Sequence, residues 1–189
     1  LPEQVIREEV KAASPEIYEK TFLNSVNVSA WELMMPRREP RIRKQLNEIM
    51  RTEAPISRSL LSSRIFNAYG ILRKTARLIE WMDGILDKTP YYKQEIDGLV
   101  FYWNTKEEAD SYTGFRIDSK REAVDLPPRE VANAARNILE QQVDLMRVTA
   151  QLLGYARFGL NVETAMRRGV QILLDGEEVK IEGGKILMK

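Results

Sequence analysis

One local pattern occurs twice in this chain, once in each half, and it limits the folds that the chain can adopt. In the first half, an apolar pair at residues 49–50 precedes the sequence Gly70-Ile-Leu-Arg73. In the second half, a similar pair at residues 138–139 precedes Gly154-Tyr-Ala-Arg157. Apolar residues recur at helical spacing on both sides of each glycine, and strand-forming residues follow. Each copy therefore predicts three helices and then a hairpin, which is the element order of a winged helix-turn-helix.

The two copies divide the chain into an N-terminal segment and two modules. We assign residues 1–39 to an N-terminal helical segment, 40–126 to a first module with a polar connector, and 127–189 to a second module. In the first module, the β-branched and aromatic run Leu99–Trp103 predicts a strand. In the second, apolar residues alternate around Gly183-Gly184, which predicts a terminal hairpin. The expected fold class is mainly α with small β-wings (α+β), built as two tandem winged-helix-like modules.

The N-terminal segment is expected to contain two short helices. Apolar residues at helical spacing predict the first over residues 3–13. Ser14-Pro15 predicts the start of the second, whose apolar stripe ends at Phe22. Arg37 to Pro40 is basic and flanked by prolines, so it is interpreted as a linker before the first module.

Polar side chains stand where several helices are expected to begin. An N-cap oxygen accepts a hydrogen bond from an unpaired N–H of the first helical turn. Ser29 is followed at the right spacing by Glu32, so this pair predicts a capping box. The expected N-caps are Ser14, Ser29, Ser57, Thr105, Asp144 and Asn161.

The composition excludes several classes of chemistry. The chain contains no cysteine and no histidine, so it holds no disulfide, no thiolate nucleophile and no Cys/His zinc site. We expect a non-enzymatic chain that needs no cofactor and no metal. The apolar run at 99–103 is too short to cross a bilayer, and charged residues interrupt the start of the chain. We therefore expect a cytoplasmic protein without a membrane partner.

The charge is nearly balanced overall, at +1, but cations gather locally. Five of them crowd into residues 37–44, which we interpret as a solvated helix face. Other cations fall on the last helix and the hairpin of each module, where helix-turn-helix proteins contact DNA. Acidic Glu80, Asp83 and Asp87 on the first of these helices oppose such contact. The candidate nucleic-acid contacts are Arg73, Lys74, Arg77, Trp81, Arg157, Arg167, Arg168, Lys180 and Lys185.

Three groups of residues resemble a known family. They are Glu53-Ala-Pro-Ile56 with Leu61, Arg64, Gly70 and Arg73; Phe101-Tyr-Trp103 with Phe115-Arg116; and Leu126-Pro-Pro128. This family of unknown function forms the C-terminal region of large bacterial helicase-like proteins. These proteins join a superfamily I helicase core to a domain similar to restriction or very-short-patch-repair endonucleases. The resemblance covers roughly residues 40–188 and implies a DNA-processing parent protein. It assigns no catalytic residue in this chain.

Three functions are compatible with these features. The first is a non-catalytic DNA-binding accessory domain of a bacterial helicase/nuclease-like protein. The second is a protein-interaction module that docks the helicase and nuclease domains of the same parent onto each other. The third and remotest is a metal-dependent nuclease built on Asp175, Glu178 and Lys180, whose Glu-x-Lys spacing is short enough to recur by chance.

Overall fold

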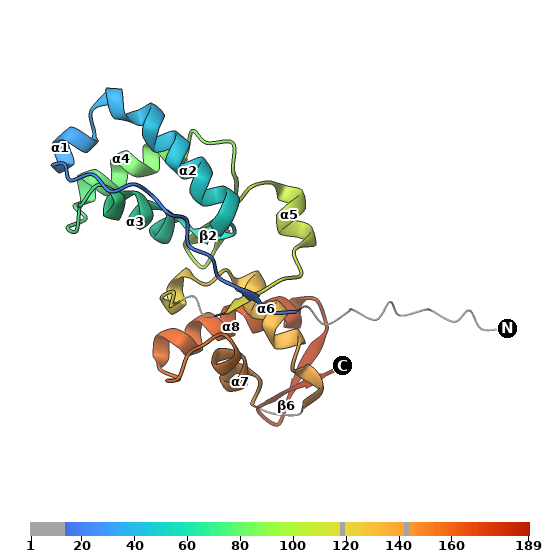
Figure 1. Ribbon diagram of the computed structural model, residues 1–189. Coiled ribbons are helices and arrows are strands. Elements are labelled where there is room, and N and C mark those ends of the chain that lie inside the picture. Colours follow the sequence, from blue (N-terminus) through green and yellow to red (C-terminus); the bar gives the residue numbers. More distant parts are fainter. Residues whose placement is uncertain (1–13, 118–119, 142–143) are drawn as a thin grey trace.

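The computed structural model describes residues 14–117, 120–141 and 144–189 (Figure 1). Within these ranges the protein is mainly α-helical with small β-sheets, as predicted. Helices α1–α5 and strands β2–β4 form the first half of the molecule, and helices α6–α8 with β6–β7 form the second half. A short parallel pair, β1 (Glu16–Ile17) and β5 (Arg116–Ile117), lies between the halves. The helix expected over residues 3–13 lies outside the described residues.

The first half combines helices with the strands of one sheet. Its helices are α1 (Ala30–Leu33), α2 (Glu39–Glu53), α3 (Arg58–Ala68), α4 (Ala76–Leu86) and α5 (Lys106–Ser111). Its strands are β2 (Ile56–Ser57), β3 (Tyr92–Ile96) and β4 (Leu99–Trp103). The strands form an antiparallel sheet in the order β2-β4-β3. Asp97 and Gly98 both have positive φ in the β3–β4 turn, and this conformation matches the twist of a two-residue hairpin.

The predicted helical stripes form the first core. Ile42, Leu46 and Ile49 of α2 are fully buried, and they pack with the buried residues of α3 and α4. Trp81 is half-buried against the same core. The sequence periodicity therefore identified the inward faces of α2 and α3, whereas Ile79 of the expected α4 stripe is exposed.

Four of the six predicted N-caps are confirmed, and Ser14 is not among them because strand β1 follows it where a helix was expected. Ser29 and Glu32 form the capping box, while Ser57, Thr105 and Asp144 each accept a backbone N–H of the following helix. The prediction for Asn161 is wrong, because helix α8 (Leu160–Asp175) begins one residue earlier, after Gly159.

The second helix predicted in the N-terminal segment is also wrong. After β1, residues 18–29 contain no regular secondary structure and run along α3 toward α1 (Figure 1). The Val26 and Val28 amides donate to the carbonyls of Ala68 and Tyr69, at 2.8 and 3.2 Å. Carbonyls at the end of a helix lack intrahelical partners, so an extended chain can bond to them. These tertiary bonds outweigh the weak helical pattern of the segment.

The basic linker expected at residues 37–40 is absent from the structure. The 3-10 helix η1 (Pro36–Arg38) leads directly into α2. Pro40 lies in the first turn of α2, where a missing N–H costs nothing because that donor has no intrahelical acceptor. Both prolines therefore start helices here, although the prediction had used them to separate segments.

The second half repeats the three-helix order. It contains α6 (Pro128–Arg136), the 3-10 helix η3 (Leu139–Gln141), α7 (Leu145–Leu152), α8, and the hairpin β6 (Val179–Glu182) and β7 (Lys185–Met188). The hairpin turns at Gly183 and Gly184, both with positive φ, as predicted. Helix η3 contacts β7. It thus lies where β2 lies in the first half, next to the last strand of the hairpin. Connector residues Phe115 and Leu126 pack into the second core.

A buried ionic cluster joins the two halves. Glu130 of α6 is fully buried, and its two carboxylate oxygens accept hydrogen bonds from Arg116 and Arg121. Arg116 also donates to the backbone carbonyls of Glu53, the last residue of α2, and of Pro55, which follows it. A single guanidinium therefore connects α6 of the second half to the end of α2 in the first.

A second set of buried contacts surrounds Glu53, which is the last residue of α2 and is fully buried. Arg64 of α3 forms an ion pair with Glu53 at 2.9 Å. The Tyr18 hydroxyl and the Thr21 amide also donate to the Glu53 carboxylate. Burial raises the pKa of the Tyr18 hydroxyl, so it stays protonated and able to donate. This carboxylate therefore fixes the N-terminal segment onto α2 and α3.

Ser57 and Asp125 link the halves at another point. The Ser57 hydroxyl donates to the buried Asp125 carboxylate of the 3-10 helix η2 (Ala123–Asp125). Ser57 thus caps α3 and bonds to the connector with the same oxygen. Burial raises the pKa of Asp125, and the hydrogen bond from Ser57 opposes that shift.

Candidate nucleic-acid interface

The repeated glycine has the same structural role in both halves. At the end of α3, the Gly70 amide donates to Asn67 and the Ile71 amide donates to Phe66. At the end of α7, Gly154 donates to Gln151 and Tyr155 donates to Ala150. These pairs define a Schellman motif, which needs a left-handed residue at the position that Gly70 (φ 72°) and Gly154 (φ 98°) occupy. The sequence repeat therefore reflects a repeated helix end followed by a turn toward the last helix.

The turn after α3 presents cations to solvent. Arg73 lies in the loop before α4 and Arg77 lies in its first turn, and both side chains are exposed. Thr75, which sequence analysis did not identify, caps α4 through its hydroxyl. Arg73 therefore precedes α4, although the sequence predicted it on the last helix of the module. Neither Arg73 nor Arg77 forms an ion pair within the described part of the chain.

The other two candidate contacts at this site, Lys74 and Trp81, each contact another part of the protein. Lys74 is exposed and donates to the Ser63 hydroxyl of α3, and its charge acts to lower the pKa of the Asp125 carboxyl. Trp81 packs against the first core, so most of its ring is directed away from any ligand. The exposed cationic surface at the start of α4 therefore consists of Arg73, Lys74 and Arg77.

The acidic residues on the later turns of α4 are largely compensated. Arg58 of α3 pairs with Asp83 at 3.5 Å and with Asp87 at 2.6 Å. Lys93 of β3 lies 3.6 Å from Asp87. Glu80 remains exposed. The repulsion of a phosphate backbone by this helix is thus weaker than the sequence indicates, because two of its three carboxylates have cationic partners.

The candidates of the second half are less available. Arg157 is exposed in the loop that corresponds to the one holding Arg73. Arg167 pairs with Glu163 on its own helix at 2.5 Å. Arg168 pairs with Asp97 at 3.2 Å, so it contacts the β3–β4 turn of the first half. The structure does not gather these three arginines into one open surface.

The terminal hairpin forms no metal site among the described residues. Lys180 pairs with Glu182 at 2.8 Å, and Lys185 is exposed across the hairpin from Glu182. Glu178 is bound by Arg136 through two hydrogen bonds of 2.6 and 2.7 Å, while Asp175 accepts from Gln171. No group of three or more potential metal ligands occurs in the described ranges. Asp175, Glu178 and Lys180 therefore do not converge as the nuclease hypothesis requires.

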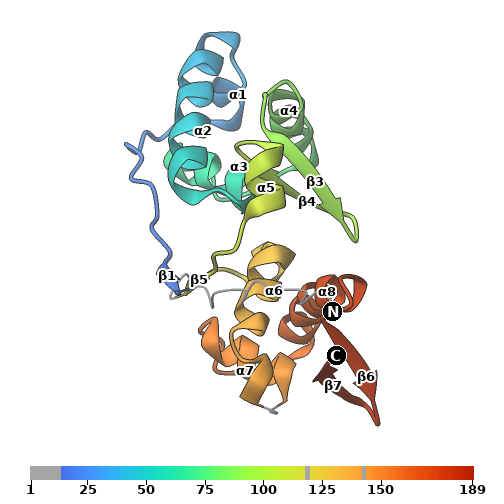
Figure 2. The same cartoon turned by 90° about the vertical axis from the view of Figure 1, so that its right-hand side faces the viewer.

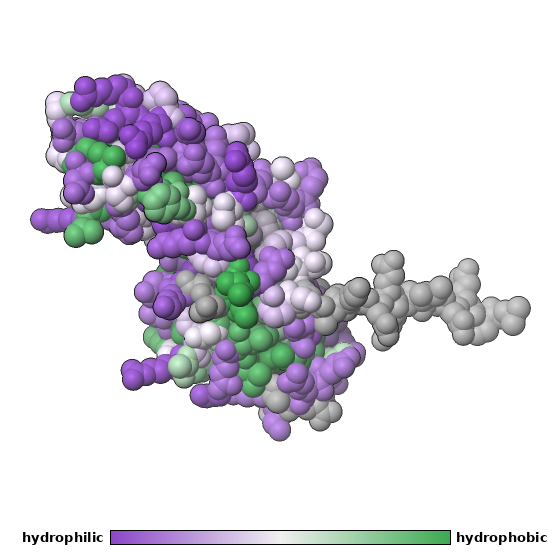
Figure 3. All heavy atoms as spheres, viewed as in Figure 1, coloured by the Kyte–Doolittle hydropathy of each residue, from purple (hydrophilic) through white to green (hydrophobic). Residues whose placement is uncertain are grey.

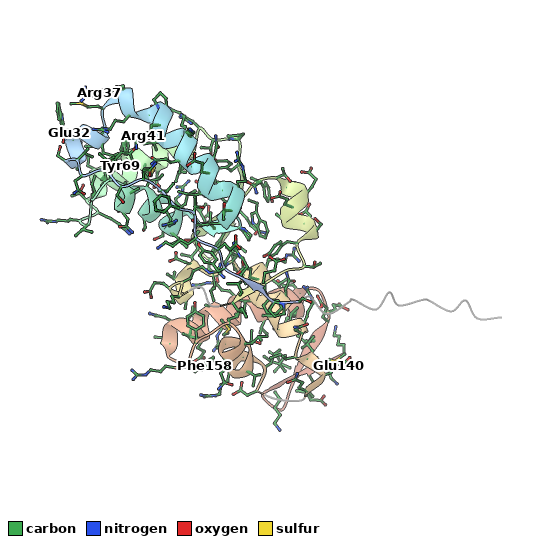
Figure 4. All side chains as sticks on the ribbon, viewed as in Figure 1. Glu32, Arg37, Arg41, Tyr69, Glu140 and Phe158 are labelled. Atoms are coloured by element: carbon green, nitrogen blue, oxygen red, sulfur yellow. The ribbon has the colours of Figure 1, made fainter. Side chains whose placement is uncertain are left out.

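A further cationic face lies on α2, and sequence analysis had interpreted it only as solvated. Figure 4 shows Arg37 and Arg41 around the start of this helix, in the region of Glu32 and Tyr69, and Arg37 belongs to η1, which precedes α2. The Arg38 guanidinium donates to the Glu32 carbonyl and stacks 5.8 Å from the centre of the Tyr69 ring. The crowding of cations at 37–44 was the available signal, but it did not show which of them lack partners.

The fold and this site define a mainly helical protein with exposed cations beside the start of one helix. One family model, described as "Protein of unknown function (DUF3320)", matches residues 32–80, from α1 into α4. No curated protein and no solved structure matches the chain. Among the described residues, no helix has the length and apolar character needed to cross a bilayer. The match therefore supports a domain-of-unknown-function family for the segment that contains Arg73 and Arg77.

Proposed function

We propose that this chain is a non-catalytic DNA-binding accessory domain, and that its first half binds DNA as a winged-helix module. The order α2-β2-α3-α4-β3-β4, with strand order β2-β4-β3, supports this assignment. In such a module α4 is the helix that enters the major groove and the β3–β4 hairpin is the wing. The observation that carries the proposal is the exposed set Arg73, Lys74 and Arg77 at the start of that helix.

The position of these cations suits a phosphate backbone. The N-terminus of a helix carries unpaired N–H groups and a partial positive charge, which favour an anion. Arg77 adds a charge in the first turn of α4, and Arg73 and Lys74 add charges in the preceding loop. The resemblance to helicase-like proteins supports a bacterial, cytoplasmic DNA-processing parent as the setting of this domain.

Replacing the two arginines should weaken DNA binding. In a low-salt fluorescence-anisotropy titration with a 20-bp duplex, we expect Arg73→Gln/Arg77→Gln to lower the affinity about tenfold or more. Each phosphate contact contributes about 0.9 to the slope of log K against log salt, so the slope should become shallower by about 1.8.

A matched control removes two arginines that already have carboxylate partners. Arg43 pairs with Glu39 and Arg147 pairs with Asp144. The variant Arg43→Gln/Arg147→Gln loses the same net charge, so it should keep a salt slope close to that of the unchanged protein. Equal effects of the two double variants would contradict the proposed site, because they would reveal a response to net charge alone.

One observation favours the docking function as a second candidate. Ile79 of α4 and Val124 of η2 are 43% and 44% exposed, and both line a cavity of about 320 Å³ between α3, α4 and the β3–β4 turn. Leu72, in the loop beside Arg73, is 87% exposed. Neighbouring exposed apolar side chains are typical of protein-binding surfaces. If the low-salt titration detects no DNA binding, a docking role between domains of the parent protein becomes the better proposal.

A further inference from the structure

The outward face of α2 carries cations that the proposed site on α4 does not use. We define the α2 ridge as Arg37, Arg41, Lys44 and Arg51. All four side chains are exposed, and none forms an ion pair with the described residues. Arg43, on the same helix, is not part of the ridge because Glu39 binds it at 2.7 Å.

The spacing of the ridge makes it a continuous surface. Arg41, Lys44 and Arg51 lie three and seven residues apart on α2, so they share one face of the helix. Arg37 precedes them in η1. At 1.5 Å per residue, Arg41 and Arg51 are separated by about 15 Å along the axis. One strand of B-DNA places a phosphate about every 3.4 Å along its axis, so this length spans about four phosphates. Glu48, which is acidic, lies between Lys44 and Arg51 on α2.

The ridge and the start of α4 face different sides of the first half. The buried stripe of α2, with Ile42, Leu46 and Ile49, turns the ridge away from the core. Figure 2 shows α2 and α4 on opposite sides of this half. Figure 3 shows hydrophilic residues along the upper edge of the first half, whereas apolar residues gather over the second half in the same view. A single straight duplex at α4 therefore does not reach the ridge.

We propose that the α2 ridge binds the phosphate backbone of a second nucleic-acid segment, so that the protein bridges two segments. This inference rests on the proposed function for the class of partner, since the same parent context supplies nucleic acid to both surfaces. We expect the ridge to contact phosphates and not bases. Its charges lie on long side chains, and no helix or strand of the ridge enters a groove. Four exposed cations that form no ion pair with the described residues match the regular negative charge of such a backbone.

The first test measures contacts at the ridge. The variant Arg41→Gln/Lys44→Gln/Arg51→Gln changes only exposed side chains, and circular dichroism should confirm an unchanged melting curve. In duplex titrations at saturating protein, we expect the second binding event to disappear. The overall salt slope should fall by about 2.7, at about 0.9 per lost contact. The control Arg43→Gln/Arg147→Gln should keep both binding events.

The second test measures bridging directly. A biotinylated duplex on beads is mixed with the full chain and a fluorescent duplex, and the retained fluorescence is measured. The unchanged protein should retain the fluorescent duplex, whereas the ridge variant should retain at least tenfold less while still binding the bead-bound duplex. Retention by the ridge variant equal to that of the unchanged protein would overturn the inference and leave the proposed function intact.

Other outcomes separate the two proposals. If Arg73→Gln/Arg77→Gln leaves all binding intact and the ridge variant abolishes it, the site on α4 is wrong and the ridge is the nucleic-acid surface. If a polyglutamate peptide of the same charge binds the ridge as tightly as the duplex does, the ligand is an acidic protein segment, and the inference is overturned.

Discussion

Glu130→Gln should lower the free energy of unfolding by about 3–5 kcal/mol, the cost typical of leaving a buried charge without its partner. Glu130 is fully buried, and Arg116 and Arg121 are 5% and 6% exposed. Glutamine keeps the shape of the side chain but removes the charge that both guanidinium groups face. Water cannot replace the lost carboxylate at this depth, so both guanidinium groups would lose the charge that Glu130 supplies. Urea denaturation, followed by circular dichroism, measures the change.

A surface carboxylate provides the control for this prediction. Glu163→Gln breaks the pair with Arg167, whose side chain is 67% exposed, and exposed pairs contribute about 0.2–1 kcal/mol at most. A loss at Glu130 no larger than the loss at Glu163 would show that the cluster does not stabilise the fold. Because Arg116 also binds carbonyls after α2, we expect Glu130→Gln to weaken the attachment of the two halves to each other.

Local features of the fold could be predicted because their causes lie within a few residues. The cap at Ser57, the Schellman motifs at Gly70 and Gly154, and the apolar stripe of α2 each depend on neighbours within one or two helical turns. The two-residue turn at Gly183-Gly184 depends on backbone freedom alone. These signals were enough for the mainly α fold and for the order of three helices and a hairpin in each half.

Long-range partners could not be predicted. Arg64 bonds to Thr21, 43 residues away, and Arg116 bonds to the Glu53 carbonyl, 63 residues away. No sequence period connects such residues, so the ionic cluster and the extended course of residues 18–29 become visible only in the folded chain. The same limit applies to the candidate site. The ion pairs of Arg58 with Asp83 and Asp87 compensate negative charge at the end of α4. The ion pair of Arg168 with Asp97 engages one of the candidate cations of α8.

Gly169→Ala should destabilise the protein by about 1–3 kcal/mol, although alanine is the better helix former. Gly169 lies in the middle of α8 and is buried against α6. A Cβ at this position would overlap the Val131 side chain and come within 3.0 Å of the Ala132 backbone nitrogen. Since backbone atoms of a packed helix cannot rotate away, α6 and α8 would have to separate. The midpoint of urea denaturation should therefore fall.

Gly84 supplies the matched comparison, because it also lies inside a helix, α4, but has no atom within 4 Å of an added Cβ. Gly84→Ala should therefore stabilise the protein by about 0.5–1 kcal/mol through the lower entropy of the unfolded chain. Both substitutions add one methyl group inside a helix. Opposite changes in the free energy of unfolding would therefore report the close approach of α6 and α8 at Gly169. If both substitutions stabilise the protein, the two helices are not in contact at Gly169, and the packing of the second half around that residue would be wrong.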